Sequence, residues 1–278
     1  MIKLFEDASV PMDGSPADVR SGALAPHAIA ASGLSLAFGG VKAVDGMDLR
    51  LGHGEFLGLI GPNGAGKTTL FNILAGTYRP DGGTVLIDGH PAPPGDAKAR
   101  IGLGLGRTFQ IPKPFPQMTV LENVLTGAQN QAGEHIWPNF LQFRRVANEE
   151  RAAVEKAKAL LDFVKLTPLM HEPARVLSGG QRKLLELARV LMADPKILLL
   201  DEPAAGVNPT LLEFIIGRVL DLNRQGKSIL LIEHNMDMVT RLCQRVVVMA
   251  GGRFLVEGSA RDVSRHPAVI EAYLGAAA

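Results

Sequence analysis

The sequence contains a glycine-rich turn that joins a short apolar segment to a helical pattern. The apolar segment is Phe56–Ile60, and the turn after it reads Gly61-Pro-Asn-Gly-Ala-Gly-Lys67-Thr68. The helical pattern covers Lys67–Ala75 and ends at Gly76. This order of strand, glycine-rich turn and helix is the context of a phosphate-binding loop, and it predicts an α/β fold.

Other apolar segments indicate how the fold continues. The later ones are uninterrupted apolar runs, which are typical of parallel strands covered by helices on both faces. The Gly251-Gly252 turn between the last two segments predicts a hairpin. The predicted strands are Leu34–Phe38, Val44–Leu51, Phe56–Ile60, Thr84–Asp88, Ile197–Leu200, Ser228–Ile232, Val246–Met249 and Phe254–Val256.

Helical patterns alternate with these strands. Apolar stripes at helical spacing predict helices over 151–166, through Leu184–Leu191 and through Leu212–Val219. Because strands and helices alternate along the chain, we expect a mainly parallel sheet with helices on both faces.

The same patterns divide the chain into parts. Residues 1–27 lack apolar periodicity, so they are predicted to form a flexible N-terminal extension. The segment 112–176 contains helices and loops but no convincing strand. We interpret it as a helical insertion into one domain over 28–278, whose core segments are 28–111 and 177–278.

The composition excludes several classes of protein. The chain has 278 residues, with 29 Lys and Arg against 28 Asp and Glu, and its net charge of +1 gives no support for a nucleic-acid partner. A single cysteine, Cys243, forms no internal disulfide, which indicates a reducing compartment, and we expect it to be an inert packed thiol. The longest uncharged run, between Arg20 and Lys42, contains Pro26 and four glycines and is no credible membrane span. We therefore expect an intracellular protein.

The glycine-rich turn carries the first chemistry. Glycines let successive backbone N–H groups curl around phosphates, and the helix N-terminus adds favourable dipole charge. Lys67 is predicted to reach the β- and γ-phosphates, and the Thr68 hydroxyl to complete a Mg²⁺ shell. The alternative is an ordinary turn before a helix, but the correct flanking strand and helix favour the phosphate-binding interpretation.

Two carboxylates follow the apolar strand Ile197–Leu200. An ionised pair at the end of a buried strand is costly unless a cation or ligand compensates it. Asp201 is therefore predicted to face Mg²⁺, and Glu202 to polarise the attacking water. Taken alone, Asp-Glu after a strand is more often the solvated start of a loop. Together with the phosphate-binding loop, the functional interpretation is favoured.

A further glycine pair lies in Leu177-Ser178-Gly179-Gly180-Gln181, at the start of a predicted helix. Ser178 and Gln181 have the spacing of a capping box, which is the structural alternative. A cap needs no glycine pair, whereas glycines allow a ligand to approach the helix start closely. The five-residue sequence resembles the signature of ATP-binding-cassette (ABC) ATPases, and it falls between the loop and Asp201-Glu202, in the order of that family.

The resemblance implies roles for further residues. Gln110 resembles the Q-loop glutamine, and His234 resembles the switch histidine near the γ-phosphate. Phe38 resembles the aromatic residue that stacks on adenine. The alternatives are that His234 is an ordinary surface histidine and that Phe38 is a core residue. The implied catalytic residues are Glu202, His234 and Gln110, with Thr68, Gln110 and Asp201 for Mg²⁺. The implied ATP-binding residues are Phe38, Gly61, Pro62, Asn63, Gly64, Ala65, Gly66, Lys67, Thr68 and Thr69, with Ser178, Gly179, Gly180 and Gln181 supplied by a second subunit.

One position departs from the family pattern. Most ABC ATPases carry Asp where this chain has Asn208, which puts in doubt any role there that needs a negative charge; Asn208 before Pro209 also fits a helix cap. The surrounding Ala204–Pro209 nevertheless resembles the corresponding segment in the ATPases of bacterial branched-chain amino-acid importers. The segments Arg107–Gln110, Met118–Val124 and Ala272–Gly275 point to the same branch.

The family also implies partners. It implies a RecA-like core with an antiparallel β-subdomain, and a head-to-tail pair of subunits that sandwiches two ATP molecules. It also implies separate membrane-spanning permease subunits and, indirectly, a periplasmic binding protein. The chain would lie on the inner face of the cell membrane. The predicted docking surface for the permease is the groove beside Gln110, which is lined by Phe109, Ile111, Phe115 and Met118. The alternative is that these residues simply cover the helical insertion. Trp137, also in the insertion, either packs or faces a partner.

Three rival functions are left open. They are a lipopolysaccharide-type exporter, a soluble ABC ATPase acting on ribosomes or DNA, and a P-loop metabolic kinase.

Overall fold

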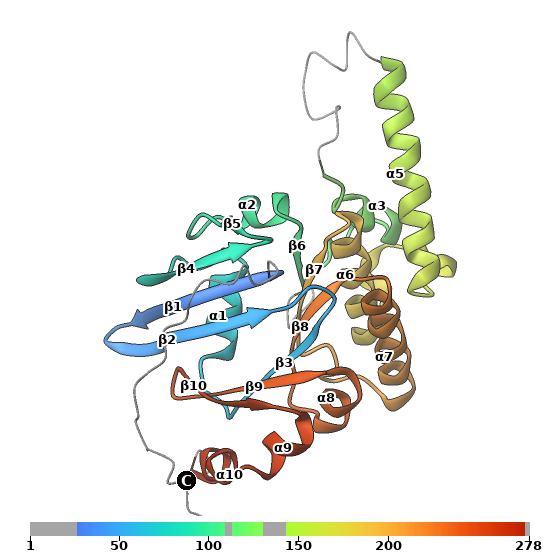
Figure 1. Ribbon diagram of the computed structural model, residues 1–278. Helices are drawn as coiled ribbons and strands as arrows, with labels where there is room; N and C mark the ends of the chain where they lie inside the picture. Colours follow the sequence, from blue (N-terminus) through green and yellow to red (C-terminus); the bar gives the residue numbers. More distant parts are fainter. Residues whose placement is uncertain (1–26, 109–112, 130–142, 276–278) are drawn as a thin grey trace, which may run out of the picture.

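The computed structural model describes residues 27–108, 113–129 and 143–275 (Figure 1). The predicted N-terminal extension therefore lies outside the described residues except for His27. The described chain forms two β-sheets and the helices packed around them (Figure 1). No described helix combines the length and the apolar character needed to cross a bilayer.

A four-stranded antiparallel sheet is formed by the N-terminal segments. Its order is β2-β1-β4-β5, and β1 pairs with both β2 and β4. The sheet confirms two predicted strands before the glycine-rich turn and one after it. The bounds are β1 Ile29–Phe38, β2 Val41–Leu51, β4 Gly82–Ile87 and β5 His90–Pro91.

The second sheet has six strands in the order β10-β9-β3-β8-β7-β6. All neighbours in it are parallel except β10, which returns antiparallel to β9 as the predicted hairpin. The short edge strand β6 was not predicted, because three residues are too few to show a period. The bounds are β3 Phe56–Ile60, β6 Leu105–Arg107, β7 Ile197–Asp201, β8 Ser228–Ile232, β9 Arg245–Ala250 and β10 Arg253–Gly258.

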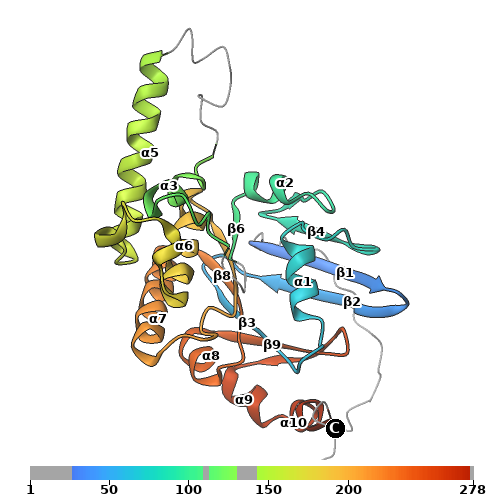
Figure 2. The ribbon, with the colours of Figure 1, turned by 180° about the vertical axis from the view of Figure 1, so that it is seen from behind.

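Helices cover both faces of the six-stranded sheet. In the view from behind, α1 lies on the side of β1 and β2, while α6 and α7 lie across β7 and β8 from it (Figure 2). The bounds are α1 Lys67–Leu74, α2 Ala97–Gly102, α3 Val120–Leu125, α5 Phe143–Phe163, α6 Gly179–Met192, α7 Pro209–Arg224, α8 Met236–Leu242, α9 Ala260–Arg265 and α10 Pro267–Gly275, with 3-10 turns η2 Thr167–Leu169 and η3 Ala174–Val176. The described part of the predicted insertion 112–176 contains no strand; it consists of helices, turns and loops, with one isolated antiparallel bridge between Thr119 and Pro173.

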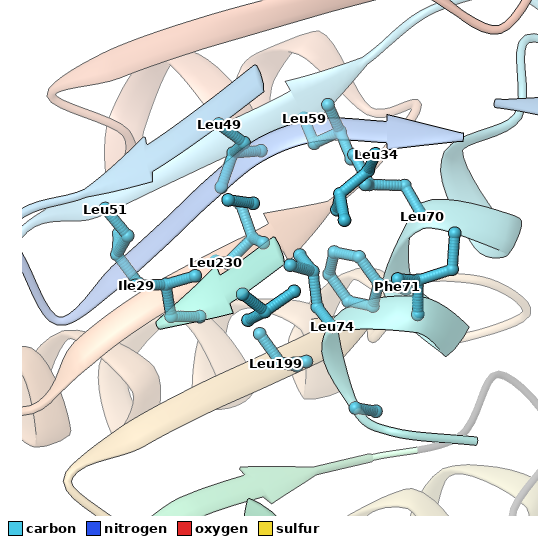
Figure 3. Close-up of a cluster of buried hydrophobic side chains, with 14 of the residues drawn as sticks. Ile29, Leu34, Leu49, Leu51, Leu59, Leu70, Phe71, Leu74, Leu199 and Leu230 are labelled. Atoms are coloured by element: carbon cyan, nitrogen blue, oxygen red, sulfur yellow. The ribbon is translucent and has the colours of Figure 1, made fainter. Parts of the chain in front are cut away.

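The apolar runs of the central strands are explained by burial on both faces. In β7, Leu199 packs with α1 and the antiparallel sheet, whereas its neighbours Leu198 and Leu200 pack with α6 and α7. Leu230 of β8 joins Leu199 on the first face (Figure 3). Each fully buried leucine contributes roughly 1.5–3 kcal/mol relative to exposure. The two cores thus hold the carboxyl ends of β3, β7 and β8 at one rigid edge.

A third, smaller core lies beneath the phosphate-binding turn. Ile60, the last residue of β3, packs with Val246 and Val248 of β9 and with Val263 of α9 and Val269 of α10. The C-terminal helices, α9 and α10, lie together below β9 (Figure 1). The last strand residue before the turn is therefore fixed by the C-terminal part of the chain.

Candidate active site

The phosphate-binding turn joins β3 to α1, as predicted. Gly66 is the N-cap of α1, adopts the left-handed conformation with φ 95° and supplies no side-chain capping bond. A Cβ atom at Gly66 would meet the carbonyl oxygen of Ala43, and one at Gly61 would meet the carbonyl oxygen of Met249. Only glycine fits at these two positions, so the first amide groups of α1 face the turn without a side chain of the cap over them.

The remaining predicted residues of the turn are distributed along it. Asn63 and Gly64 are exposed at its tip, Ala65 is buried, Thr68 is exposed and Thr69 is half-buried in α1. The N–H of Gly252 donates to the Ala65 carbonyl at 3.1 Å, which ties the turn to the β9–β10 hairpin.

Lys67 is buried and points back over the turn. Its Nζ atom donates to the carbonyl oxygens of Gly61 at 2.7 Å and Pro62 at 2.9 Å. Burial lowers the pKa of Lys67, while the charges of Glu202 and Asp201 oppose that shift. The ammonium group therefore lies near the carboxyl end of β7, where Asp201 and Glu202 are found.

Asp201 is the last residue of β7 and is buried. Its Oδ2 atom lies 3.4 Å from Nη2 of Arg107, and its backbone N–H donates to the Thr108 hydroxyl at 3.3 Å. Burial raises the pKa of Asp201, and the Arg107 guanidinium opposes that shift. Its Oδ1 atom is also buried and has no hydrogen-bond partner among the described residues.

That unpartnered oxygen tests whether Mg²⁺ fits the site. Asp201 and Thr68 line the same cavity, so a carboxylate oxygen and a hydroxyl are available to one cation. The described residues contain no cluster of three His, Cys, Asp or Glu side chains suited to a metal. Mg²⁺ is commonly held by one or two protein oxygens together with water and substrate phosphates, so the two side chains fit it.

Glu202 and His234 come together from neighbouring strands. Glu202 directly follows β7, and His234 follows β8 by two residues; Nε2 of His234 lies 2.7 Å from Oε1 of Glu202. Glu202 has the left-handed φ of 46°, and its N–H donates to the Ile232 carbonyl at 3.0 Å. The predicted water-polarising and switch residues are thus in direct contact.

The glycine-pair segment starts α6 as predicted. Ser178 and Gln181 form a complete capping box, in which each side chain accepts from the other residue's N–H. A Cβ atom at Gly179 would meet nothing within 4 Å, which agrees with a free approach. At Gly180 it would meet the Leu211 side chain, so close packing of α6 on α7 is a second reason for that glycine.

Phe38 lies at the end of β1 and is 50% exposed, so the core alternative is wrong. Its ring packs edge-on against Tyr78, with centroids 5.7 Å apart. Asn208 accepts from the Leu211 N–H at 2.9 Å as the N-cap of α7, which confirms the capping interpretation.

Several predictions fall outside the described residues. Gln110, Phe109, Ile111 and Trp137 are among the residues whose structure is not described. Phe115 is 49% exposed, and Met118 is half-buried beside α3.

The structure adds residues that sequence reasoning missed. Glu233 is buried and accepts from the N–H groups of Ala204 and His234, and Lys183 of α6 donates to the Glu202 carbonyl at 2.9 Å. Glu233 had a signal in the sequence, because it directly follows the apolar strand β8 just as Glu202 directly follows β7. Tyr273 of α10 also reaches the turn: burial raises its pKa, and a hydrogen bond with the Gly61 backbone opposes that shift.

Comparisons with known proteins agree with this geometry. A family model described as "ABC transporter" matches residues 44–205, and one described as "Branched-chain amino acid ATP-binding cassette transporter" matches 255–278. The chain is 43% identical to a probable branched-chain amino acid transport ATP-binding protein LivG of Archaeoglobus fulgidus, over 87% of this chain and 93% of that protein. It is 40% identical to the high-affinity branched-chain amino acid transport ATP-binding protein LivG of Escherichia coli, over 90% and 98%.

Solved structures show the same fold. A nucleotide-free ATP-binding cassette from an ABC transporter matches with a TM-score of 0.77 and 36% identity, over 89% of this chain and 98% of that one. An ADP conformation of such a cassette matches with a TM-score of 0.76 and 35% identity, over 90% and 99%. The predicted α/β fold is confirmed, and the metabolic-kinase alternative is wrong. The chain belongs to the ABC transporter family as an ATP-binding cassette, the ATPase subunit of such a transporter, homologous to the branched-chain amino acid transport ATP-binding proteins.

Proposed function

We propose that the chain pairs head to tail with a second cassette, hydrolyses Mg²⁺-ATP between the two, and drives uptake of branched-chain or related amino acids. Separate permease subunits would span the membrane, a periplasmic binding protein would deliver the amino acid, and this chain would lie on the inner face of the membrane. The contact between Glu202 and His234, at the edge that also holds Lys67, carries the proposal. The names of the relatives support the choice of substrate.

The chain's own side chains account for hydrolysis. The Glu202 carboxylate accepts a proton from water as the water oxygen bonds to the γ-phosphorus. The bond between that phosphorus and the β–γ bridging oxygen breaks, and ADP and phosphate leave. Lys67 and the amide groups at the start of α1 stabilise the phosphate charge, while His234 orients the Glu202 carboxylate through their 2.7 Å contact.

Asp201 and Thr68 would hold the cation, and Gln110 is proposed as its third ligand from this chain. Bound Mg²⁺ supplies positive charge that neutralises the β- and γ-phosphate oxygens during transfer. The Oδ1 atom of Asp201 has no hydrogen-bond partner among the described residues, and this supports the assignment.

The start of α6 is proposed to contact the ATP of the partner subunit. Ser178 and Gly179 are exposed, and no residue of 178–181 lines the cavity beside Thr68 in its own chain. A helix N-terminus and a Ser hydroxyl are suited to a γ-phosphate, so their exposure supports a role across the dimer interface.

The docking surface for the permease is proposed to include Phe115 and Met118, near the start of the helical subdomain 112–176. Phe115 is exposed there, and the guanidinium carbon of Arg189 lies 5.3 Å from the centroid of its ring. The cavity that contains Thr68 and Asp201 extends to Lys113 and Arg189, so this surface adjoins the ATP site. A movement of the chain at this docking surface would therefore occur next to the proposed site of the ATP phosphates.

Transport in proteoliposomes tests the proposal. The chain, its partner cassette and the permease are expected to copurify and to accumulate labelled leucine only with ATP and binding protein. Phe115→Asp is expected to abolish uptake while basal ATP hydrolysis changes less than about twofold. Phe254→Asp is the matched control, because Phe254 is equally exposed but lies on β10.

Failure to copurify with any membrane protein would favour a soluble ABC ATPase. Copurification without amino-acid uptake would contradict the substrate and leave the exporter alternative. Uptake that survives Phe115→Asp would refute the docking surface alone.

A further inference from the structure

The turn Glu202–Ala204, which carries the catalytic carboxylate, is held through its backbone. Lys183 Nζ donates to the carbonyl oxygen of Glu202 at 2.9 Å and to that of Pro203 at 3.2 Å. The N–H of Ala204 donates to Oε1 of Glu233 at 2.8 Å. Two side chains from separate parts of the chain therefore bond backbone groups of three consecutive residues in this turn.

Glu233 also holds the segment that carries the histidine. Its Oε2 atom accepts from the N–H groups of His234 at 3.1 Å and Asn235 at 3.3 Å. The residue is 3% exposed, and a buried carboxylate is tolerated when several N–H groups donate to it. One carboxylate thus joins the backbone beside Glu202 to the backbone of His234.

Lys183 makes the connection to α6. It lies one helical turn after Gly179, so its position follows that of the exposed start of α6. Burial lowers the pKa of Lys183, and the charges of Glu233, Glu202 and Glu186 oppose that shift. The side chain therefore lies within a group of carboxylates and donates to carbonyl oxygens next to one of them.

The backbone that these side chains hold is strained. Glu202 has φ 46°, a conformation that non-glycine residues adopt when surrounding contacts impose it. The bonds from Lys183 and Glu233 on either side of the turn are such contacts. Without them the Glu202 side chain would lose its fixed direction toward His234.

We propose that Glu233 and Lys183 are positioning residues of the ATPase reaction. Glu233 fixes the geometry of the Glu202–His234 pair, and Lys183 makes that geometry depend on the position of α6. The inference rests on the proposed catalytic role of Glu202. Because the start of α6 is proposed to contact the partner's ATP, Lys183 would link nucleotide at one site to the carboxylate of the other.

The test measures kcat, KM and the dissociation constant of ATP in Glu233→Gln and Lys183→Met, in the assembled transporter. In Glu233→Gln an NH₂ group replaces one acceptor oxygen and cannot accept from an N–H. In Lys183→Met the stem remains and the donor is lost. Each variant is expected to lower kcat at least tenfold, while KM and the ATP dissociation constant change less than threefold. Lys183→Arg is expected to recover most of kcat, because a guanidinium also donates to two carbonyl oxygens.

Two matched controls separate positioning from stability. Glu55→Gln removes a partly buried carboxylate that accepts from the Gly52 N–H and pairs with Arg245. Lys227→Met removes a lysine that donates to the Pro195 carbonyl at 2.7 Å, at the opposite edge of the sheet. Both controls are expected to lower Tm and to leave kcat within about twofold of the parent.

The outcomes are distinct. A kcat within twofold of the parent in either Lys183→Met or a folded Glu233→Gln overturns the proposal, as does a parallel loss of kcat, ATP affinity and Tm. If Glu233→Gln does not fold, Lys183→Met and its Arg rescue decide alone. Retained turnover in Glu202→Gln would instead refute the proposed catalytic role, whatever the other variants do.

Discussion

Nε2 of His234 lies 2.7 Å from Oε1 of Glu202, although 32 positions separate the two residues in the chain. The side chain of Glu202 is 15% exposed and that of His234 is 42% exposed, so the pair has one sheltered and one open member. Parallel strands β7 and β8 end at the same edge, and this places both residues there. A carboxylate sheltered in this way is suited to accept a proton from a single ordered water.

Glu202→Gln is expected to reduce kcat by about 10²–10⁴-fold, because an amide cannot accept the proton of the attacking water. ATP binding should persist, so the variant should accumulate as an ATP-bound dimer. Steady-state phosphate release and size-exclusion chromatography with ATP measure the two effects. Glu213→Gln is the control, since Glu213 is an exposed carboxylate of α7 paired with Arg241. Turnover like that of the parent would contradict the role of Glu202.

Gly66→Ala is expected to destabilise the fold by at least about 2 kcal/mol, because the new Cβ meets the Ala43 carbonyl in a left-handed conformation. Gly217→Ala is the opposite case. Gly217 lies inside α7 with open space around it, so alanine there should stabilise the fold by about 0.5–1 kcal/mol. Urea unfolding of both variants measures the difference. Equal stabilities would refute the close approach at Gly66.

Asn208→Asp is expected to change stability by only a few tenths of a kcal/mol, because Asp and Asn are equally good N-caps. The negative charge also suits the N-terminus of α7. Asn208→Ala removes the acceptor for the Leu211 N–H and should cost about 1 kcal/mol. Thermal unfolding of the three proteins tests the order. A large loss in Asn208→Asp would show that the site rejects charge for another reason.

Cys243 is expected to react very slowly with thiol reagents in the folded protein. Burial raises the pKa of its thiol to about 12, compared with about 8.5 in an unfolded chain, so little thiolate exists at pH 8.5. The thiol stays protonated to a higher pH in the folded state than in the unfolded state. Its contribution to stability is therefore full below about pH 8.5 and is lost as the pH rises toward 12. Disulfide-exchange labelling with and without urea measures the contrast. Equal labelling rates would contradict the burial.

The local features of this protein could be predicted from its sequence. The turn Gly61–Thr68, the capping box of Ser178 and Gln181, and the cap at Asn208 each depend on residues a few positions apart. The apolar runs of β7 and β8 identified strands covered on both faces, because a continuous run leaves no polar face for water. Family resemblance then indicated which side chains meet at the active site.

Only the tertiary structure decided how those local features are held together. Glu233 joins the segments after β7 and β8, Lys183 reaches the Glu202 turn from α6, and Arg107 approaches Asp201 from the unpredicted strand β6. These partners are separated by 19 to 94 positions in the chain. No period or motif encodes such distances, because they arise when packed cores bring strand ends and helices together. The sequence determined the groups that are proposed to react, and the fold determined their mutual geometry.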